Sequence, residues 1–224
     1  TTTQSPIAPA ASAHPFDLRT DETLAALRAA GQFKHLRMLD SPMDAVVKVR
    51  GYGDCLCFCS NNYLGLANHP DLLAAAHRSL DIDGLGAGAS RLVSGSMSAH
   101  DEAERALADY VGAEASILFS TGYAANVGTL SALVGPGDVV FSDALNHASL
   151  IDGCRLSKAQ VHVFRHLDVD HLEDLLKAHR GQHGTALIVT DSLFSMDGDE
   201  APLRALRELA DRHDAALILD EAHA

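Results

Sequence analysis

Residues 186–220 read ALIVTDSLFSMDGDEAPLRALRELADRHDAALILD, and this stretch decides the fold class. Its runs at 186–190 and 215–219 are almost continuously apolar, as expected of strands that are covered on both faces. A helical pattern at 203–213 lies between them. A strand, a helix and a second strand in this order predict two parallel strands joined by a crossover helix.

The same alternation extends toward the N-terminus. Helical spacing and short apolar runs follow one another from about residue 70, which predicts an α/β fold with a mainly parallel sheet. Further helices are expected at 71–80, 100–111, 124–134, 147–157 and 169–179, and further strands at 115–119, 138–142 and 160–164.

The first 60 residues follow a different pattern. Residues 1–15 are rich in Thr, Ala, Ser and Pro, which indicates a flexible tail. A helix is expected from the cap pair Thr20-Asp21 to Gly31, and strands at 45–50 and 55–60 predict a hairpin. The expected organisation is therefore a tail at 1–15, a helix and hairpin at 16–60, and a large domain at 61–224.

Composition excludes several functional classes. The 224 residues are 47% hydrophobic, which supports a sizeable core, and the net charge of −13 argues against nucleic acid and anionic membranes as partners. No apolar run approaches the ~18 residues that a membrane span needs. The four cysteines, Cys55, Cys57, Cys59 and Cys154, form no CxxC pattern. Together with the lack of a secretory signal, they indicate reduced thiols in the cytoplasm.

Polar residues follow the apolar runs repeatedly, and open α/β sheets bind ligands at the carboxyl ends of their strands. The residues that follow the runs are Ser120-Thr121-Gly122-Tyr123, Asp143, Asn146-His147, Asp191, Ser195, Asp220 and His223. This clustering predicts a ligand site at one edge of the sheet.

Each of these groups has a structural and a functional interpretation. The turn at 120–123 is either an ordinary connection or an anion site, because a glycine and a helix start admit a phosphate. His147 is either solvated or able to stack on a planar ligand. Asp220 either caps a turn or pairs with a cation at the end of a buried strand. Asp220 and His223 have no third partner at a metal-ligand spacing, so no metal is expected.

Six segments together resemble the α-oxoamine synthases, which are fold-type I enzymes dependent on pyridoxal 5′-phosphate (PLP). They are NNYLGL at 61–66, GAGASRLVSG at 86–95, STGYAAN at 120–126, SDALNHAS at 142–149, FSMDGD at 194–199 and DEAH at 220–223. The resemblance implies a three-layer α/β/α large domain that binds PLP. It also implies decarboxylative condensation of an amino acid with an acyl thioester of CoA or acyl carrier protein, in a homodimer.

The resemblance also implies roles for individual residues. Backbone N–H groups of Gly122 and Tyr123 would bind the PLP phosphate, and His147 would stack on the pyridine ring. Asp220 would pair with the pyridine nitrogen. His223 would hydrogen-bond the ring's 3-oxygen, Ser195 would lie beside the same ring, and Asn61 would lie near the substrate carboxylate.

The lysine that holds PLP in this family follows the DEAH motif, and this sequence ends one residue after His223. Its lysines are Lys34, Lys48, Lys158 and Lys177, and none has the family's lysine context. We therefore expect the 224 residues to be the front part of a longer enzyme, without the PLP lysine and the small C-terminal domain. Alone, they are expected to be inactive.

Two subgroups of the family share features with the sequence. Residues 89–95 and 195–203 are most similar to the biotin-pathway subgroup, which joins L-alanine to a pimeloyl thioester. Residues 61–63 and 67–70 are closer to the subgroup that joins glycine to an acetyl group. Three further candidates are a serine palmitoyltransferase-like enzyme, a fold-type I aminotransferase and a non-catalytic partner subunit of the same fold.

Overall fold

The structure is a computed structural model that describes residues 14–224, so the tail expected at 1–15 lies almost wholly outside the described residues. The chain divides into two compact units, one up to Ser79 and one from Leu80. The domain division expected between residues 60 and 61 stays a prediction. Within the described range, no helix combines the length and the apolar character that a membrane crossing requires.

The first unit contains the predicted helix and hairpin. Helix α1 (Pro15–Ala29) is followed by strands β1 (Val46–Val49) and β2 (Gly53–Leu56), which pair antiparallel. A 3₁₀ helix (Leu66–Asn68) and α2 (Pro70–Asp83) follow, and α2 crosses into the second unit. The second strand was expected at 55–60 but begins two residues earlier and ends four residues earlier. Gly51 and Gly53 both adopt φ of +81° and close a tighter turn than expected.

The start predicted for the first helix was wrong. The helix begins at Pro15 rather than near Thr20, and the ring nitrogen Nδ1 of His14 accepts the Phe16 N–H at 3.2 Å. Proline has a fixed φ that suits the first helical position, where its missing N–H costs nothing. The predicted end is confirmed, since Gly31 lies just beyond the helix with φ of +66°.

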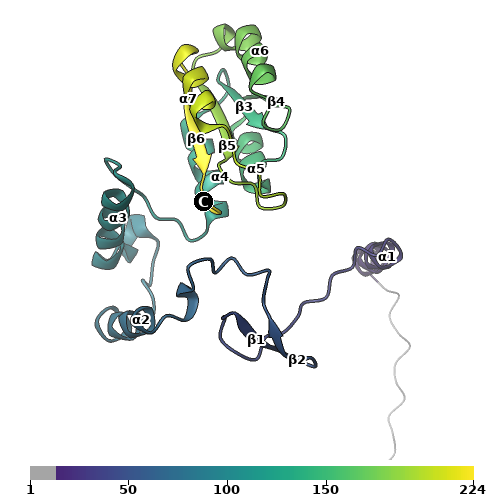
Figure 1. Cartoon of the computed structure of the whole chain (residues 1–224), viewed down its shortest axis with the longest axis vertical. Helices are drawn as coiled ribbons and strands as arrows, with labels where there is room; N and C mark the ends of the chain where they lie inside the picture. Colours follow the sequence, from purple (N-terminus) through teal and green to yellow (C-terminus); the bar gives the residue numbers. More distant parts are fainter. Residues whose placement is uncertain (1–13) are drawn as a thin grey trace, which may run out of the picture. The chain divides into compact units, whose positions relative to one another are not determined.

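The second unit is built on a four-stranded parallel sheet (Figure 1). Its strands are β3 (Val139–Asp143), β4 (Gln160–Phe164), β5 (Ala186–Asp191) and β6 (Ala216–Asp220), in the spatial order β4-β3-β5-β6. The helices of this unit are a π-helix (Arg91–Gly95), α3 (Ser98–Val111), α4 (Gly122–Leu133), α5 (Ala148–Ser157), α6 (Val169–His179), a 3₁₀ helix (Arg180–Gln182) and α7 (Leu203–Arg212). The predicted parallel α/β fold is confirmed.

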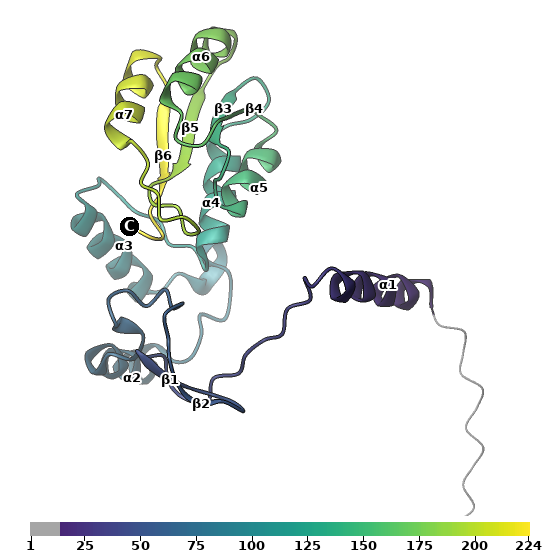
Figure 2. The same ribbon diagram turned by 45° about the vertical axis from the view of Figure 1, so that its right-hand side comes forward.

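Alternate residues of each central strand point to opposite faces and bury two separate cores. Phe141 and Ile188 pack with α6 and α7 on one face, through Leu172, Leu206 and their neighbours. On the other face the β3 and β5 side chains pack with α4 and α5. Figure 2 shows α4 and α5 next to each other beside the strands. The layers are therefore helix, sheet and helix.

The strand expected at 115–119 is absent, and this prediction was wrong. The segment is irregular, and Ile117 is 70% exposed. Its polar groups bond to α3 instead of to a strand: the Leu118 N–H donates to the Glu104 carboxylate at 2.8 Å, and the Ser116 hydroxyl donates to the Glu104 carbonyl at 2.7 Å. The apolar residues of this segment are typical of a strand, but no strand of the described residues pairs with it.

Candidate functional site

A cavity of about 350 Å³ lies at the carboxyl end of the sheet. Its walls come from the first turn of α4, the start of α5, the ends of β5 and β6, and the turn after β6. Five of the seven predicted site residues line it, namely Gly122, Tyr123, His147, Asp220 and His223. The clustering expected from the strand ends is therefore present in the second unit.

The first turn of α4 leaves two backbone amides available to a ligand. Thr121 caps the helix, because its hydroxyl oxygen accepts the Ala124 N–H at 3.0 Å and its carbonyl accepts the Ala125 N–H. The N–H groups of Gly122 and Tyr123 precede these and have no acceptor inside the helix. Two free amides at the positive end of a helix form a favourable place for an anion.

The Tyr123 side chain fixes this turn in place. Its hydroxyl donates to the Asp152 carboxylate on α5 at 2.7 Å, and this hydrogen bond raises the pKa of Tyr123. The phenol therefore links α4 to α5. The same residue also lines the cavity.

Asp220, the last residue of β6, is half-buried and is held at both carboxylate oxygens. Oδ2 accepts from the Asn126 side-chain amide at 2.7 Å, and Oδ1 accepts the Ala222 N–H at 2.9 Å. Among residues 14–224, no lysine or arginine forms an ion pair with it. A carboxylate at a cavity wall that forms no ion pair with a described lysine or arginine suits a positively charged group of a ligand.

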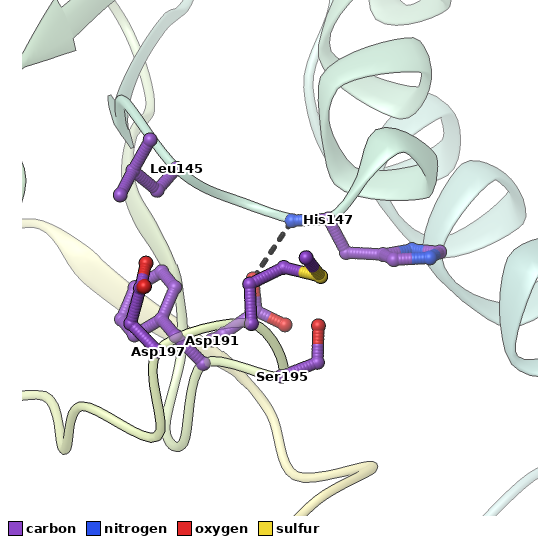
Figure 3. Close-up of a pocket in the computed structure, with 7 residues that line it drawn as sticks. Leu145, His147, Asp191, Ser195 and Asp197 are labelled. Carbon is purple, nitrogen blue, oxygen red and sulfur yellow. Dashed lines mark hydrogen bonds between the residues drawn. The ribbon is translucent and has the colours of Figure 1, made fainter. Parts of the chain in front are cut away.

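His147 caps the start of α5 and is held beside the carboxyl end of β5. Its side chain accepts the Ser149 N–H, and its own backbone N–H donates to Asp191 at 2.8 Å. Figure 3 shows this hydrogen bond, with the imidazole directed away from the Asp191 carboxylate. The ring is thus placed by the helix cap and remains exposed at the cavity.

Asp191, the last residue of β5, was expected in the polar cluster at the sheet edge, but no individual role was predicted for it. It is only 5% exposed and lines the cavity. Burial raises the pKa of Asp191, and the charge of Asp220 adds to this effect, although the His147 N–H opposes it. The buried side chain of Asn146 anchors the same strand end, because it accepts the Asp191 N–H and donates to the Val189 carbonyl.

Ser195 lies in a second cavity of about 220 Å³, which shares His147 and Asp191 with the first (Figure 3). His166 holds the loop that carries Ser195, since its two ring nitrogens contact Asp143 at 2.9 Å and Asp199 at 3.2 Å. The Phe194 ring packs edge-on against the same imidazole. The loop is therefore fastened to the end of β3.

Asn61, the seventh predicted site residue, belongs to the first unit, so its role near a substrate stays a prediction. Asn126 and Ser149 line the cavity but carried no predicted role, although both lie in family motifs, at 120–126 and 142–149. Within the described residues, no group of three or more His, Cys, Asp or Glu side chains could hold a metal ion.

Comparison with known proteins gives consistent matches. The sequence model of the aminotransferase class I and II family matches residues 53–224. The 8-amino-7-oxononanoate synthase of Citrifermentans bemidjiense is 50% identical over 202 residues, which are 90% of this chain and 51% of the relative. That of Chromobacterium violaceum is 52% identical over 187 residues, 83% of this chain and 48% of the relative.

Solved structures give the same picture. Serine palmitoyltransferase of Sphingomonas wittichii superimposes with a TM-score of 0.83 at 34% identity, covering 92% of this chain and 51% of that one. The 8-amino-7-oxononanoate synthase of Francisella tularensis gives a TM-score of 0.61 at 28% identity, with 73% and 44% covered. The chain thus spans about half the length of the relatives that it matches.

Proposed function

The chain belongs to the aminotransferase class I and II family, and we propose that the protein containing it is a PLP-dependent 8-amino-7-oxononanoate synthase. Such an enzyme joins L-alanine to a pimeloyl thioester, carried by CoA or acyl carrier protein, with loss of carbon dioxide. The observation that carries the proposal is the cavity of the second unit, which combines an anion site, a carboxylate and an imidazole.

The residues of this cavity fit PLP by their chemistry. The amides of Gly122 and Tyr123 suit a phosphate, and Asp220, which has no lysine or arginine partner in the described part of the chain, suits a protonated ring nitrogen. The exposed imidazole of His147 offers a flat face to a planar ring. A cavity of about 350 Å³ falls at the small end of the range of ligand pockets.

PLP, when bound, supplies an electron sink that stabilises negative charge on the α-carbon of an amino acid. The protein's own groups would tune that chemistry. Asp220 would hold a proton on the pyridine nitrogen, and its two hydrogen bonds keep the carboxylate in one orientation. His223 would hydrogen-bond the 3-oxygen of the ring and Ser195 would lie beside it. Asn61 would lie near the substrate carboxylate.

His147 would have two tasks in this proposal. Its ring would pack on the cofactor, and its nitrogen on the cavity side would donate a hydrogen bond to the acyl carbonyl oxygen. The backbone contact with Asp191 and the cap of α5 fix the position of this ring. A donor held in place before the reaction costs no reorganisation when charge develops on that oxygen.

Sequence similarity favours the biotin-pathway reaction over its rivals. Identity to the 8-amino-7-oxononanoate synthases is about 50%, against 34% to the serine palmitoyltransferase of Sphingomonas wittichii. A serine palmitoyltransferase-like enzyme is therefore the second candidate, on the strength of its TM-score of 0.83. Glycine C-acetyltransferase is a third, because residues 61–63 resemble it.

A homodimer in the cytoplasm completes the proposal. The family resemblance supports a dimer in which residues 86–95 contact either the partner subunit or the neighbouring active site. The acidic composition supports a protein that does not bind nucleic acid or anionic membranes.

A substrate screen on the full-length protein tests the function. L-alanine, glycine and L-serine are each combined with pimeloyl-CoA, acetyl-CoA and palmitoyl-CoA, and release of the free thiol is followed. The proposal predicts the highest kcat/KM with L-alanine and pimeloyl-CoA. Turnover confined to glycine with acetyl-CoA, or to L-serine with palmitoyl-CoA, would replace the biotin-pathway assignment by the corresponding rival.

A further inference from the structure

Two side chains without a role in the proposed reaction connect Asp220 to His147. The Asn126 side-chain nitrogen Nδ2 donates to Asp220 Oδ2 at 2.7 Å and to Ser149 Oγ at 2.9 Å. Ser149 Oγ in turn lies 2.7 Å from His147 Nδ1. The chain of contacts joins the end of β6, the first turns of α4 and the start of α5, and all four residues line the same cavity.

The chemistry of the groups sets the direction of every hydrogen bond in this chain. An ionised carboxylate can only accept, so the amide nitrogen of Asn126, not its oxygen, must face Asp220. That nitrogen has two hydrogens, and the second points to Ser149 Oγ. The serine oxygen therefore accepts from Asn126. Because the Ser149 backbone N–H already donates to His147 Nδ1, this nitrogen is an acceptor, and the serine hydroxyl donates its proton to it.

The proton position on His147 follows from this arrangement. Nδ1 accepts from the Ser149 hydroxyl and also from the Ser149 backbone N–H at 3.3 Å. A neutral imidazole that accepts at Nδ1 carries its proton on Nε2. The nitrogen that remains for the cavity is therefore a hydrogen-bond donor, which is the form needed to bind an acyl carbonyl oxygen.

A purely structural role in joining α4 to α5 is already filled by other contacts. Leu130, Leu150 and Cys154 bury their side chains between the two helices. Tyr123 adds a hydrogen bond to Asp152 near the start of α4. Ser149 is fully buried. Asn126 donates to the Asp220 carboxylate at the cavity wall, and this hydrogen bond is not needed for the apolar packing of the two helices.

We infer that Asn126 and Ser149 are positioning residues, with Asn126 orienting the Asp220 carboxylate and Ser149 holding His147 as the Nε2–H tautomer. The inference rests on the proposed function for its effect on turnover. Its effect on the protein's own groups can be read without any acyl substrate. Asn126 holds Asp220 Oδ2 while the Ala222 N–H holds Oδ1, which leaves one further lone pair on each oxygen for a ligand. Ser149 makes the cavity side of His147 a donor.

The test uses the full-length protein and the variants Asn126→Ala, Asn126→Asp and Ser149→Ala. Ser157→Ala is the matched control, because Ser157 is a buried serine of the same helix that bonds only to local backbone. The first readout is the pH dependence of the absorbance of bound PLP. Both Asn126 variants are expected to shift this profile, and Ser157→Ala is expected to leave it unchanged.

The second readout is the protonation of His147, followed by nitrogen NMR of the imidazole without PLP and assigned with His147→Gln. Wild type is expected to show Nε2 protonated and Nδ1 accepting. Ser149→Ala is expected to show a mixture of tautomers in which the backbone N–H of residue 149 still favours the Nε2–H form. The third readout is turnover. Loss of a hydrogen bond to a charged or reacting group predicts a fall in kcat of roughly tenfold or more, with a smaller change in KM.

Unchanged PLP spectra and an unchanged His147 tautomer in these variants, with only a lower unfolding midpoint, would overturn the inference. The spectra and the NMR do not depend on which acyl substrate is correct. A wild-type protein that turns over none of the substrate pairs would therefore refute the proposed function, while a shifted spectrum in Asn126→Asp and a mixed tautomer in Ser149→Ala would still support the positioning roles.

Discussion

Asp191 and Asp220 are register partners at the carboxyl ends of neighbouring parallel strands, so two carboxylates lie side by side at the cavity wall. Asp220 is held by Asn126 and by the Ala222 N–H, whereas Asp191 is buried and accepts the His147 N–H. Burial raises the pKa of Asp191, and the neighbouring Asp220 raises it further. The pair concentrates negative charge where the proposal requires a cationic ring nitrogen.

Replacing Asp191 by asparagine is expected to stabilise the unliganded protein at pH 7. A raised pKa means that the folded state binds a proton more readily than the unfolded state, so this group destabilises the fold increasingly as the pH rises from about 3.9 through the folded value. The introduced asparagine would still accept the His147 N–H through its amide oxygen. In urea unfolding of full-length Asp191→Asn, the midpoint should exceed that of wild type at pH 7 and match it near pH 4.

The exposed carboxylate of Asp197 in the next loop provides the control (Figure 3). Asp197→Asn should leave the unfolding midpoint unchanged at both pH values. A lower midpoint of Asp191→Asn at pH 7 would contradict this account of the buried carboxylate.

His166 is expected to stabilise the protein more at acidic than at alkaline pH. Burial lowers the pKa of His166, but hydrogen bonds to Asp143 and Asp199 outweigh it and raise the pKa overall. The resulting stability is fully present below the ordinary histidine pKa of about 6.5 and is lost as the pH rises through the folded value. His166→Gln should therefore destabilise by about 1–2 kcal/mol at pH 5.5 and by less at pH 8.5.

His77→Gln, at an exposed residue of α2, is the control variant at both pH values. Urea unfolding at both pH values measures the difference. An equal loss of stability at pH 5.5 and 8.5 would show that the charge of His166 has no part in holding the loop.

The Arg91–Glu104 ion pair gives the opposite pH dependence. Hydrogen bonds from Arg91 at 2.5 Å and from the Leu118 N–H lower the pKa of Glu104 to about 2. The stabilisation is therefore present above the ordinary glutamate pKa of about 4.3 and disappears as the pH falls toward 2. Glu104→Gln should unfold at a lower urea concentration than wild type at pH 7. The difference between the two unfolding midpoints should become smaller as the pH falls from 4.5 to 3. A difference in unfolding midpoint that does not change with pH would contradict a contribution of this ion pair to stability.

Gly153 permits the close approach of α5 to α4 that supports the cavity. An added Cβ would lie 2.8 Å from Leu130 Cδ1 and 3.1 Å from the Asn126 carbonyl. Alanine favours a helix by up to about 1 kcal/mol over glycine, but overpacking costs about 1–3 kcal/mol, so the clash should outweigh the propensity. Gly153→Ala should lower stability, whereas Gly181→Ala, with open space around the new Cβ, should not. A more stable Gly153→Ala would show that the helices can move apart.

Much of the second unit could be predicted because its local signals agree with one another. The apolar runs at 186–190 and 215–219 are strands β5 and β6, and the helices between strands lie within two residues of their expected starts. Parallel strands carry their polar ends to one edge, so the positions of His147 and Asp220 in one cavity follow from topology, whereas Gly122 reaches the same cavity from an irregular segment.

The failures have a common physical cause. Residues 115–119 have the composition of a strand, but a strand requires a neighbour to pair with, and the backbone here bonds to Glu104. Asn126 and Ser149 lie in two of the family motifs, but no local pattern predicts their contacts, because the bonds between them and to Asp220 join residues that are 23 and 94 positions apart. Contacts of this kind depend on how the helices pack against the sheet.

The most direct test of the central claim compares Asp220 variants of the full-length protein in the condensation of L-alanine with pimeloyl-CoA. Wild type is predicted to release thiol. Asp220→Ala and the isosteric Asp220→Asn are predicted to lose roughly a hundredfold or more in kcat, because no carboxylate would hold the proton on the ring nitrogen. Their unfolding midpoints serve to show that both variants are folded. Wild-type turnover by either folded variant would contradict the assignment of this cavity as the PLP site.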